Sequence, residues 1–470
     1  MLAQLKRLGG DSLLYALMNV GTKLIAFLML PIFTAYLGKE QMGVLENIDS
    51  FTSMLTFLVI FGTDSALAFY YFDTKNRELK MSFVQTVLQF RLAVAMLCLL
   101  VAAVGGEWMS LLITKESGHG IVILAAMVTL VLESVITLVL TYYRYEFKAK
   151  KVVIYTVIRL GAAALLAYLF LRMWSEEVDV IYFGRNIAAG FIVLLLLPDL
   201  FKLIRIKVDK EQMKAILKYA APLVPASLAF WIIATSNRFI LTYFEGVGSA
   251  GLYGVAVKFA TVITLLTSSV QMAWRPYTMS IKDRPDAKKI FSKFYLIILL
   301  GGIIGLLGIA TFIPYIFKFM ISNPEFHSAS QYIALLSAGT FLNFYYLIIS
   351  VGLFIKKETK IISVYFGAAA ALSFVLNVTL IPLLSQWGAA LAVTISYLFA
   401  TVMIFIRSQK TYYVPVPVGK MITLFLAGMA AMGVLVWIHN AGLPGYYLVF
   451  PWLFFAAVFG ASRVLKEIKS

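Results

Sequence analysis

One stretch near the start of the chain, residues 12–43, is SLLYALMNVGTKLIAFLMLPIFTAYLGKEQMG. Its apolar part, residues 12–37, exceeds the roughly 20 residues that a helix needs to cross a bilayer. It is too long for the apolar core of a signal peptide, and no small-residue cleavage site follows it. We therefore expect a membrane-spanning helix that ends in a short turn, where Gly38 and Gly43 flank Lys-Glu-Gln-Met.

The rest of the chain repeats this pattern. Of 470 residues, 61% are hydrophobic and 13% are charged, whereas a soluble domain carries about 25% charged residues. The single cysteine, Cys98, excludes an intramolecular disulfide or a zinc framework. Apolar runs between polar breaks predict an all-α polytopic membrane protein of about 14 transmembrane helices. The expected helices are 12–37, 41–68, 82–113, 119–143, 152–174, 180–201, 216–244, 248–278, 291–320, 328–355, 360–383, 386–407, 420–439 and 443–462.

The basic residues fall on one side of this layout. Most of the 40 lysines and arginines lie at one set of alternate helix ends, among them Lys6, Arg7, Arg205, Lys207, Lys466 and Lys469. The other loops contain only Lys39, Lys115 and Arg172. Positive charge collects on the cytoplasmic side of membrane proteins, so both termini are expected in the cytoplasm. The net charge of +17 is then explained by anionic lipid headgroups, and nucleic acid is not an expected partner.

The turn between the first two helices recurs. Gly246 and Gly251 have the spacing of Gly38 and Gly43 at an offset of 208 residues, which accommodates six helices. This predicts parallel repeats of six helices, related by an axis along the membrane normal. Parallel repeats of this kind bind substrate near the membrane midplane. Pro222 and Pro225 near the start of the seventh helix are consistent with either a tolerated helix start or a hinge.

Three segments carry a resemblance. They are LPIFTAYLGKEQMGVLENIDSF (30–51), LKYAAPLVPASLAFWIIATSNRFILTYFEGVGSAGLYGVAVKFA (217–260) and QMAWRPYTMS (271–280). In them the chain resembles the polysaccharide and oligosaccharide flippases, a family in the superfamily that also holds multidrug extruders and lipid II flippases. The resemblance implies two six-helix lobes, residues 1–205 and 206–410, around a cavity lined by helices 1, 2, 7 and 8. It also implies an appended helix pair in 411–470. Family members commonly have Asp-Arg where this chain has Asn237-Arg238. The resemblance therefore implies a role for the cation Arg238 but not for an acid at position 237.

Charges within the expected helices form two groups, and each charge at a helix centre costs about 2.5–3.5 kcal/mol on insertion scales. The outer group comprises Lys23, Glu46, Asp49, Arg238 and Lys258 on helices 1, 2, 7 and 8. We expect Lys23, Arg238 and Lys258, with Tyr15, Asn19 and Asn237, to contact a diphosphate headgroup. The alternative is that Glu46 and Asp49 pair with these cations as a latch.

The inner group comprises Asp64, Arg91, Glu133 and Arg159. Two acids and two bases on neighbouring helices favour a structural salt-bridge network, with proton coupling through Glu133 as the alternative. No metal site is expected, because His119, His327 and His439 lie far apart in the sequence at helix ends and are predicted to be surface residues.

The function that these features favour is a flippase, without a cofactor, that moves a polyprenyl-diphosphate-linked oligosaccharide outward across a bacterial plasma membrane. Coupling to H+, Na+ or the membrane potential is open, and polysaccharide polymerase machinery is a further candidate partner. Two alternatives stand beside it. An ion-coupled extruder of organic cations would show exposed acids without competing bases. A membrane enzyme would need a sizeable loop carrying acids or histidines, and the loops here are short and mainly basic.

Overall fold

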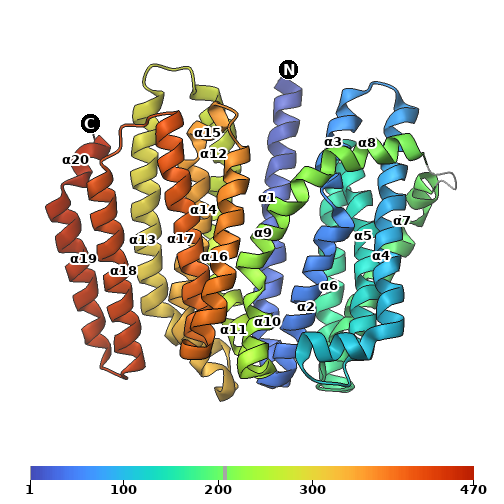
Figure 1. Cartoon of the computed structure of the whole chain (residues 1–470), viewed down its shortest axis with the longest axis horizontal. Helices are drawn as coiled ribbons and strands as arrows, with labels where there is room; N and C mark the ends of the chain where they lie inside the picture. Colours follow the sequence, from blue (N-terminus) through green and yellow to red (C-terminus); the bar gives the residue numbers. More distant parts are fainter. Residues whose placement is uncertain (1, 205–208, 470) are drawn as a thin grey trace. The chain divides into compact units, whose positions relative to one another are not determined.

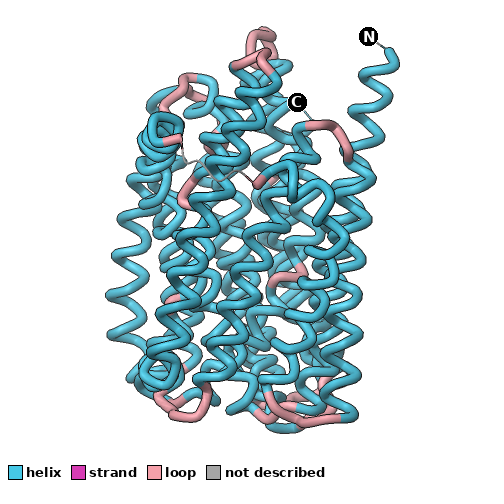
Figure 2. Tube along the Cα trace, turned by 90° about the vertical axis from the view of Figure 1, so that its right-hand side faces the viewer, coloured by secondary structure: helices cyan, strands magenta, loops and turns pink. Residues whose placement is uncertain are grey.

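The computed structural model describes residues 2–204 and 209–469, and of residues 2–13, Leu266, Ser269, Lys466, Ile468 and Lys469 it describes the backbone only. Arg205, Lys207 and the expected lobe boundary at 205–206 therefore lie outside the described residues. The described chain consists of helices, turns and short loops, with no strand in those two ranges (Figure 2). Within them, 14 helical segments are long and apolar enough to cross a membrane, which confirms the predicted fold class.

The chain divides into two compact units. Unit 1 comprises residues 1–231 and 238–251, and unit 2 comprises 232–237 and 252–470. Unit 1 contains α1 (Leu2–Tyr36), α2 (Lys39–Ile60), α3 (Thr63–Asp73), α4 (Arg77–Thr114), α5 (Gly120–Tyr145), α6 (Ala149–Met173), α7 (Val178–Leu203), α8 (Lys210–Ala220), the 3-10 helix η1 (Ala221–Leu223), most of α9 (Val224–Thr235) and α10 (Asn237–Glu245), and the start of α11 (Val247–Ala260) (Figure 1).

Unit 2 contains the remainder of α11 and the helices that follow it. These are α12 (Ile263–Ile281), α13 (Ala287–Met320), η2 (Pro324–Ala329), α14 (Ser330–Ile349), α15 (Val351–Ile355), α16 (Lys360–Leu384), α17 (Gln386–Thr411), α18 (Val418–Asn440), η3 (Gly445–Leu448), α19 (Val449–Ser462) and α20 (Val464–Lys469). The division into lobes at 1–205, 206–410 and 411–470 stays a prediction.

Each unit has its own apolar core. In unit 1, Val84 of α4, Val139 of α5 and Ile192 of α7 are fully buried. In unit 2, Phe291 of α13 and Phe341 of α14 are at most 1% exposed. Many large apolar side chains are nevertheless exposed on the outer helix faces. Helices that are apolar all round suit a bilayer, because their outer faces meet lipid.

Several helices expected to be continuous are broken, and these expectations were wrong in detail. The run 41–68 is interrupted between α2 and α3, where Phe61 and Gly62 both have positive φ, 47° and 70°. Residues 261 and 262 separate α11 from α12 in the run 248–278. The run 328–355 is divided between α14 and α15 at Ser350. No proline marks these three breaks, so the apolar pattern alone carried no signal of them.

The seventh expected helix, 216–244, is also broken. A 3-10 turn, η1, contains Pro222, and Pro225 follows it in the first turn of α9. Proline lacks the amide hydrogen that an α-helix needs, which accounts for the turn. The turn lies in unit 1 beside the α2–α3 break, since a Cβ on Gly62 would come within 3.0 Å of the Ala220 carbonyl oxygen. Two irregular backbone segments thus meet at one place. A hinge at Pro222 and Pro225, the alternative to a tolerated helix start, stays a prediction.

The C-terminal helices α18 and α19 pack side by side, next to α13 (Figure 1). Gly428 of α18 allows α18 to approach α13 closely, because a Cβ at this position would overlap the Ile303 side chain of α13. A Cβ on Gly433, on the same helix, would have no neighbouring atom within 4 Å. The two glycines therefore differ in packing but not in helix propensity.

We predict that Gly428→Val destabilises unit 2 by about 1–3 kcal/mol, because overpacking forces the two helices apart. Gly433→Val introduces the same side chain into free space and serves as the matched control. Thermal unfolding of the purified proteins in one detergent compares them. Equal melting temperatures for the two variants would contradict the packing that the structure shows.

Candidate functional site

The repeated glycine turns meet each other within unit 1. A Cβ on Gly43 of α2 would overlap the Val247 carbonyl oxygen of α11, and a Cβ on Gly251 would overlap the Lys39 carbonyl oxygen. The offset of 208 residues relates Gly43 to Gly251 and Lys39 to Val247. Each contact is therefore the counterpart of the other, as a two-fold relation between the repeats requires. Glycine is needed at both positions because the backbones touch directly. The repeat was recognisable in the sequence, and the structure shows that its two copies pack reciprocally.

A buried ion pair lies one to two turns further along α2. Nε of Arg238 donates to Oε2 of Glu46 at 3.0 Å, and the two side chains are 9% and 4% exposed. Each residue lies about 10 Å from the end of its helix that adjoins the glycine turn, at 1.5 Å rise per residue. The amide of Asn47 donates to the Thr242 hydroxyl at 2.6 Å and to the Ile113 carbonyl at 3.1 Å. We call Gly43, Glu46, Asn47, Arg238, Thr242, Val247 and Gly251 together the α2–α10 interface.

Asp49 pairs with a residue that sequence reasoning missed. Its carboxylate accepts from both terminal nitrogens of Arg185 on α7, at 2.6 and 3.1 Å, and from the Tyr182 hydroxyl at 2.7 Å. This bidentate geometry is the strongest form of an arginine–carboxylate contact. Arg185 lies seven residues inside the start of α7, at the depth of Glu46 and Arg238. The signal was available, because a lone arginine in an apolar run needs an acid on a neighbouring helix.

The inner group forms two separate pairs. Arg91, fully buried on α4, donates to Asp64 at 2.7 Å and to the Thr63 hydroxyl, both at the start of α3. Arg159 of α6 forms an ion pair with Glu133 of α5. The structure thus contains the expected neutralisation of two acids by two bases. Whether these pairs are purely structural or move a proton stays a prediction.

The remaining candidates are distributed over both units. Asn19 and Lys23 are exposed and Tyr15 is half-buried, all three on α1 in unit 1. Among the described residues, the Lys23 side chain forms no ion pair or hydrogen bond. Lys258 is half-buried in unit 2, and Asn237, also in unit 2, is buried and donates to the Tyr253 hydroxyl at 3.0 Å. The expected convergence of Lys23, Arg238 and Lys258 on one headgroup stays a prediction.

Comparison with known proteins agrees with this architecture. Residues 8–282 match the family model described as polysaccharide biosynthesis protein. No curated protein sequence matches the chain significantly.

Among solved structures, the lipid II flippase MurJ in an inward closed conformation has a TM-score of 0.75 at 13% identity, over 96% of this chain and 98% of that one. An inward-facing multidrug resistance MATE family transporter of the MOP superfamily has a TM-score of 0.64 at 13% identity, over 83% and 94%. A MATE transporter of Vibrio cholerae has a TM-score of 0.55 at 12% identity, over 86% and 96%. At these identities the likeness establishes a shared fold.

We predict strong coupling between Glu46 and Arg238 in stability. Removing one partner leaves a buried charge without its counter-charge and costs about 3–5 kcal/mol, whereas replacing both with apolar groups is close to neutral. Glu46→Leu and Arg238→Met should therefore each destabilise the protein more than the double variant does. Unfolding of the purified variants in one detergent measures the double-mutant cycle.

The exposed pair Arg284–Asp286, joined at 2.7 Å with side chains 58% and 48% exposed, is the matched control. Solvent screens such a pair, so its cycle should show little coupling. Additive single effects at Glu46 and Arg238 would show that this pair contributes no interaction of its own.

Proposed function

This chain belongs to the polysaccharide biosynthesis protein family, and on that premise we propose that it is an alternating-access flippase for a polyprenyl-diphosphate-linked oligosaccharide. The protein is a multi-pass membrane protein with the fold that lipid II flippase and MATE structures share. Those neighbours include a lipid flippase and multidrug transporters, so the fold is compatible with either substrate class. The charges of the chain are what favour the flippase.

One observation carries the proposal. Each of the four acids that the sequence analysis placed within the helices is bonded to an arginine: Glu46 to Arg238, Asp49 to Arg185, Asp64 to Arg91 and Glu133 to Arg159. Lys23 has no such partner within the described chain. An extruder of organic cations needs a carboxylate that is available to its substrate. Here the available charge is positive, which favours an anionic substrate.

The chemistry of a diphosphate fits this balance. A phosphate group that leaves water for a membrane protein loses hydration, and fixed cations can replace part of it. Lys23 on α1 offers a point charge on an exposed side chain, one turn from the exposed amide of Asn19. Arg238 can hold phosphate oxygens bidentately once its contact with Glu46 opens. In this proposal, substrate phosphate and the Glu46 carboxylate are alternative partners of the same guanidinium.

The α2–α10 interface supplies a barrier for such a cycle. Its glycines bring two backbones into direct contact, and its polar side chains are bonded to one another. Opening it would expose Glu46, Asn47 and Arg238, all of them buried here. We propose that this interface closes the outer end of the transport path, and that the α2–α3 break and the η1 turn accommodate its opening. The plasma membrane of a bacterium is the proposed location.

The sharpest test uses Lys23. Lys23→Gln breaks no ion pair, so the folded protein should keep its thermal stability while flipping falls by at least about tenfold, the loss expected for one charge-assisted phosphate contact. Lys150→Gln is the control, since Lys150 is exposed near the start of α6. The measurement is protection of a fluorescent polyprenyl-diphosphate glycan from a membrane-impermeant quencher in reconstituted vesicles. Arg238→Glu should abolish flipping while the protein still inserts.

Three results would count against the proposal. Unchanged flipping in Lys23→Gln would remove this lysine from substrate handling. Unchanged flipping in a well-inserted Arg238→Glu protein would remove the arginine as well. Wild-type vesicles that export an organic cation and leave the lipid-linked glycan in place would assign the chain to the extruders.

A further inference from the structure

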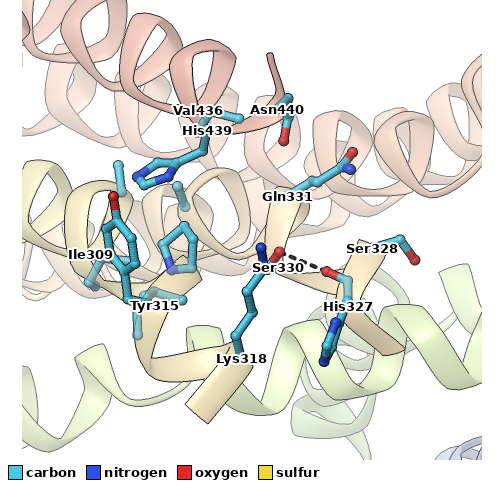
Figure 3. A pocket seen from close by; sticks show the side chains of 14 residues that line it. Ile309, Tyr315, Lys318, His327, Ser328, Ser330, Gln331, Val436, His439 and Asn440 are labelled. Atoms are coloured by element: carbon cyan, nitrogen blue, oxygen red, sulfur yellow. Dashed lines mark hydrogen bonds between the residues drawn. The ribbon is translucent and has the colours of Figure 1, made fainter. Parts of the chain in front are cut away.

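A cavity of about 340 Å3 lies in unit 2, apart from the residues discussed above. Three elements line it: the C-terminal end of α13, the η2–α14 segment and the C-terminal end of α18 (Figure 3). All three belong to the helix ends that carry few basic residues, the ends that the charge pattern predicts to be outside. Helices that span the bilayer place such ends at the depth of lipid headgroups.

The polar lining of this cavity is biased toward positive charge. Lys318 is its one lysine or arginine, and no aspartate or glutamate is among the described lining residues. Lys318, Gln331 and Asn440 form no side-chain hydrogen bond or ion pair within the described chain. Lys318 extends from α13 toward the middle of the lining residues, between Tyr315 and His439 on one side and His327 on the other (Figure 3). These groups can donate to an anion without first breaking an internal bond.

Two histidines complete the polar side, although the sequence analysis predicted both to be separate surface residues. His327 bonds through Nε2 to the Ile321 carbonyl at 3.0 Å, and His439 bonds through Nε2 to the Thr311 carbonyl at 3.1 Å. A carbonyl oxygen only accepts, so Nε2 carries the hydrogen in each ring. In the neutral ring Nδ1 is then an acceptor for a hydroxyl group. The cavity therefore offers donors for an anion and acceptors for hydroxyls.

The remaining lining contains the hydroxyls of Ser328 and Ser330 and an apolar part from the same helices. Ile309, Ala310 and Ile313 of α13, Ala334 of α14 and Val436 of α18 form the apolar part. A ligand that suits both parts has a charged, hydroxylated head and a hydrocarbon portion. We propose that this cavity binds the phosphodiester headgroup of an anionic phospholipid, with a hydroxylated headgroup of the phosphoglycerol type as the best fit.

The location of the cavity gives the bound lipid a structural consequence. Thr311 of α13 is one point where α18 and α19 contact α13: its carbonyl accepts from His439 of α18, and its hydroxyl accepts from the Trp452 indole at 3.0 Å. A headgroup that bonds to Lys318, Gln331 and Asn440 would connect α13, α14 and α18. Occupancy should therefore stabilise the attachment of α18 and α19, since a ligand that binds only the folded state stabilises it.

The test titrates the purified full-length protein in detergent with phosphatidylglycerol or with phosphatidylcholine of the same acyl chains. Native mass spectrometry should show phosphatidylglycerol retained in preference to phosphatidylcholine, with a matching rise in melting temperature. Lys318→Gln should weaken phosphatidylglycerol binding about tenfold, as expected for losing one charge-assisted bond to phosphate. Arg172→Gln, which removes an exposed positive charge at the corresponding end of α6, should bind as the wild type does.

Each contrary outcome is decisive. Equal retention of the two lipids, or unchanged binding in Lys318→Gln, would overturn the proposal. An equal rise in melting temperature with inorganic phosphate alone would assign the cavity to a free anion instead of a lipid. The Lys318 side chain makes no hydrogen bond or ion pair within the described chain, so Lys318→Gln without lipid should have the melting temperature of the wild type. A lower melting temperature would show that Lys318 has a structural role.

Discussion

A charge inside a bilayer needs a partner, and this requirement organises unit 1. Glu46, Asp49, Asp64 and Glu133 are each joined to an arginine on another helix, which ties α2 to α10 and α7, α3 to α4, and α5 to α6. Eight unpaired charges at about 2.5–3.5 kcal/mol each would exceed a net stability of about 5–15 kcal/mol. Apolar packing brings these helices into contact, and the ion pairs determine which helix faces lie against each other.

All four partners of these acids are arginines, and the reason is chemical. Arginine stays charged at any accessible pH, and its planar fork can satisfy a carboxylate with two bonds, as Arg185 does for Asp49. A lysine in the same position can lose its proton when buried. The candidate lysine of unit 1, Lys23, is accordingly exposed. Arginine is thus the base in each of the four ion pairs, and the lysine of the group is the base whose side chain is exposed.

Helix number and placement were predictable from the sequence because the bilayer permits few alternatives. The sequence also placed Glu46 and Arg238 within apolar helices. Arg185 and Lys318 were missed, although each is a single base in an apolar run, as Lys23 and Arg91 are. Phe61 and Gly62 gave no warning of the α2–α3 break. His327 and His439, 112 residues apart, line one cavity through tertiary packing that no local pattern encodes.

Comparison of the two repeats distinguishes the contacts on which the fold depends from the charges that transport would use. The backbone contacts of Gly43 and Gly251 are exchanged by the offset of 208 residues, so they belong to the shared scaffold. The charges do not follow this symmetry: Glu46 corresponds to Gly254, Arg238 to Leu30 and Lys23 to Trp231. A scaffold that packs through glycine at both copies does not require an ion pair at one of them. Under the proposed function, the buried Glu46–Arg238 pair would handle substrate charge in addition to fixing which helix faces meet.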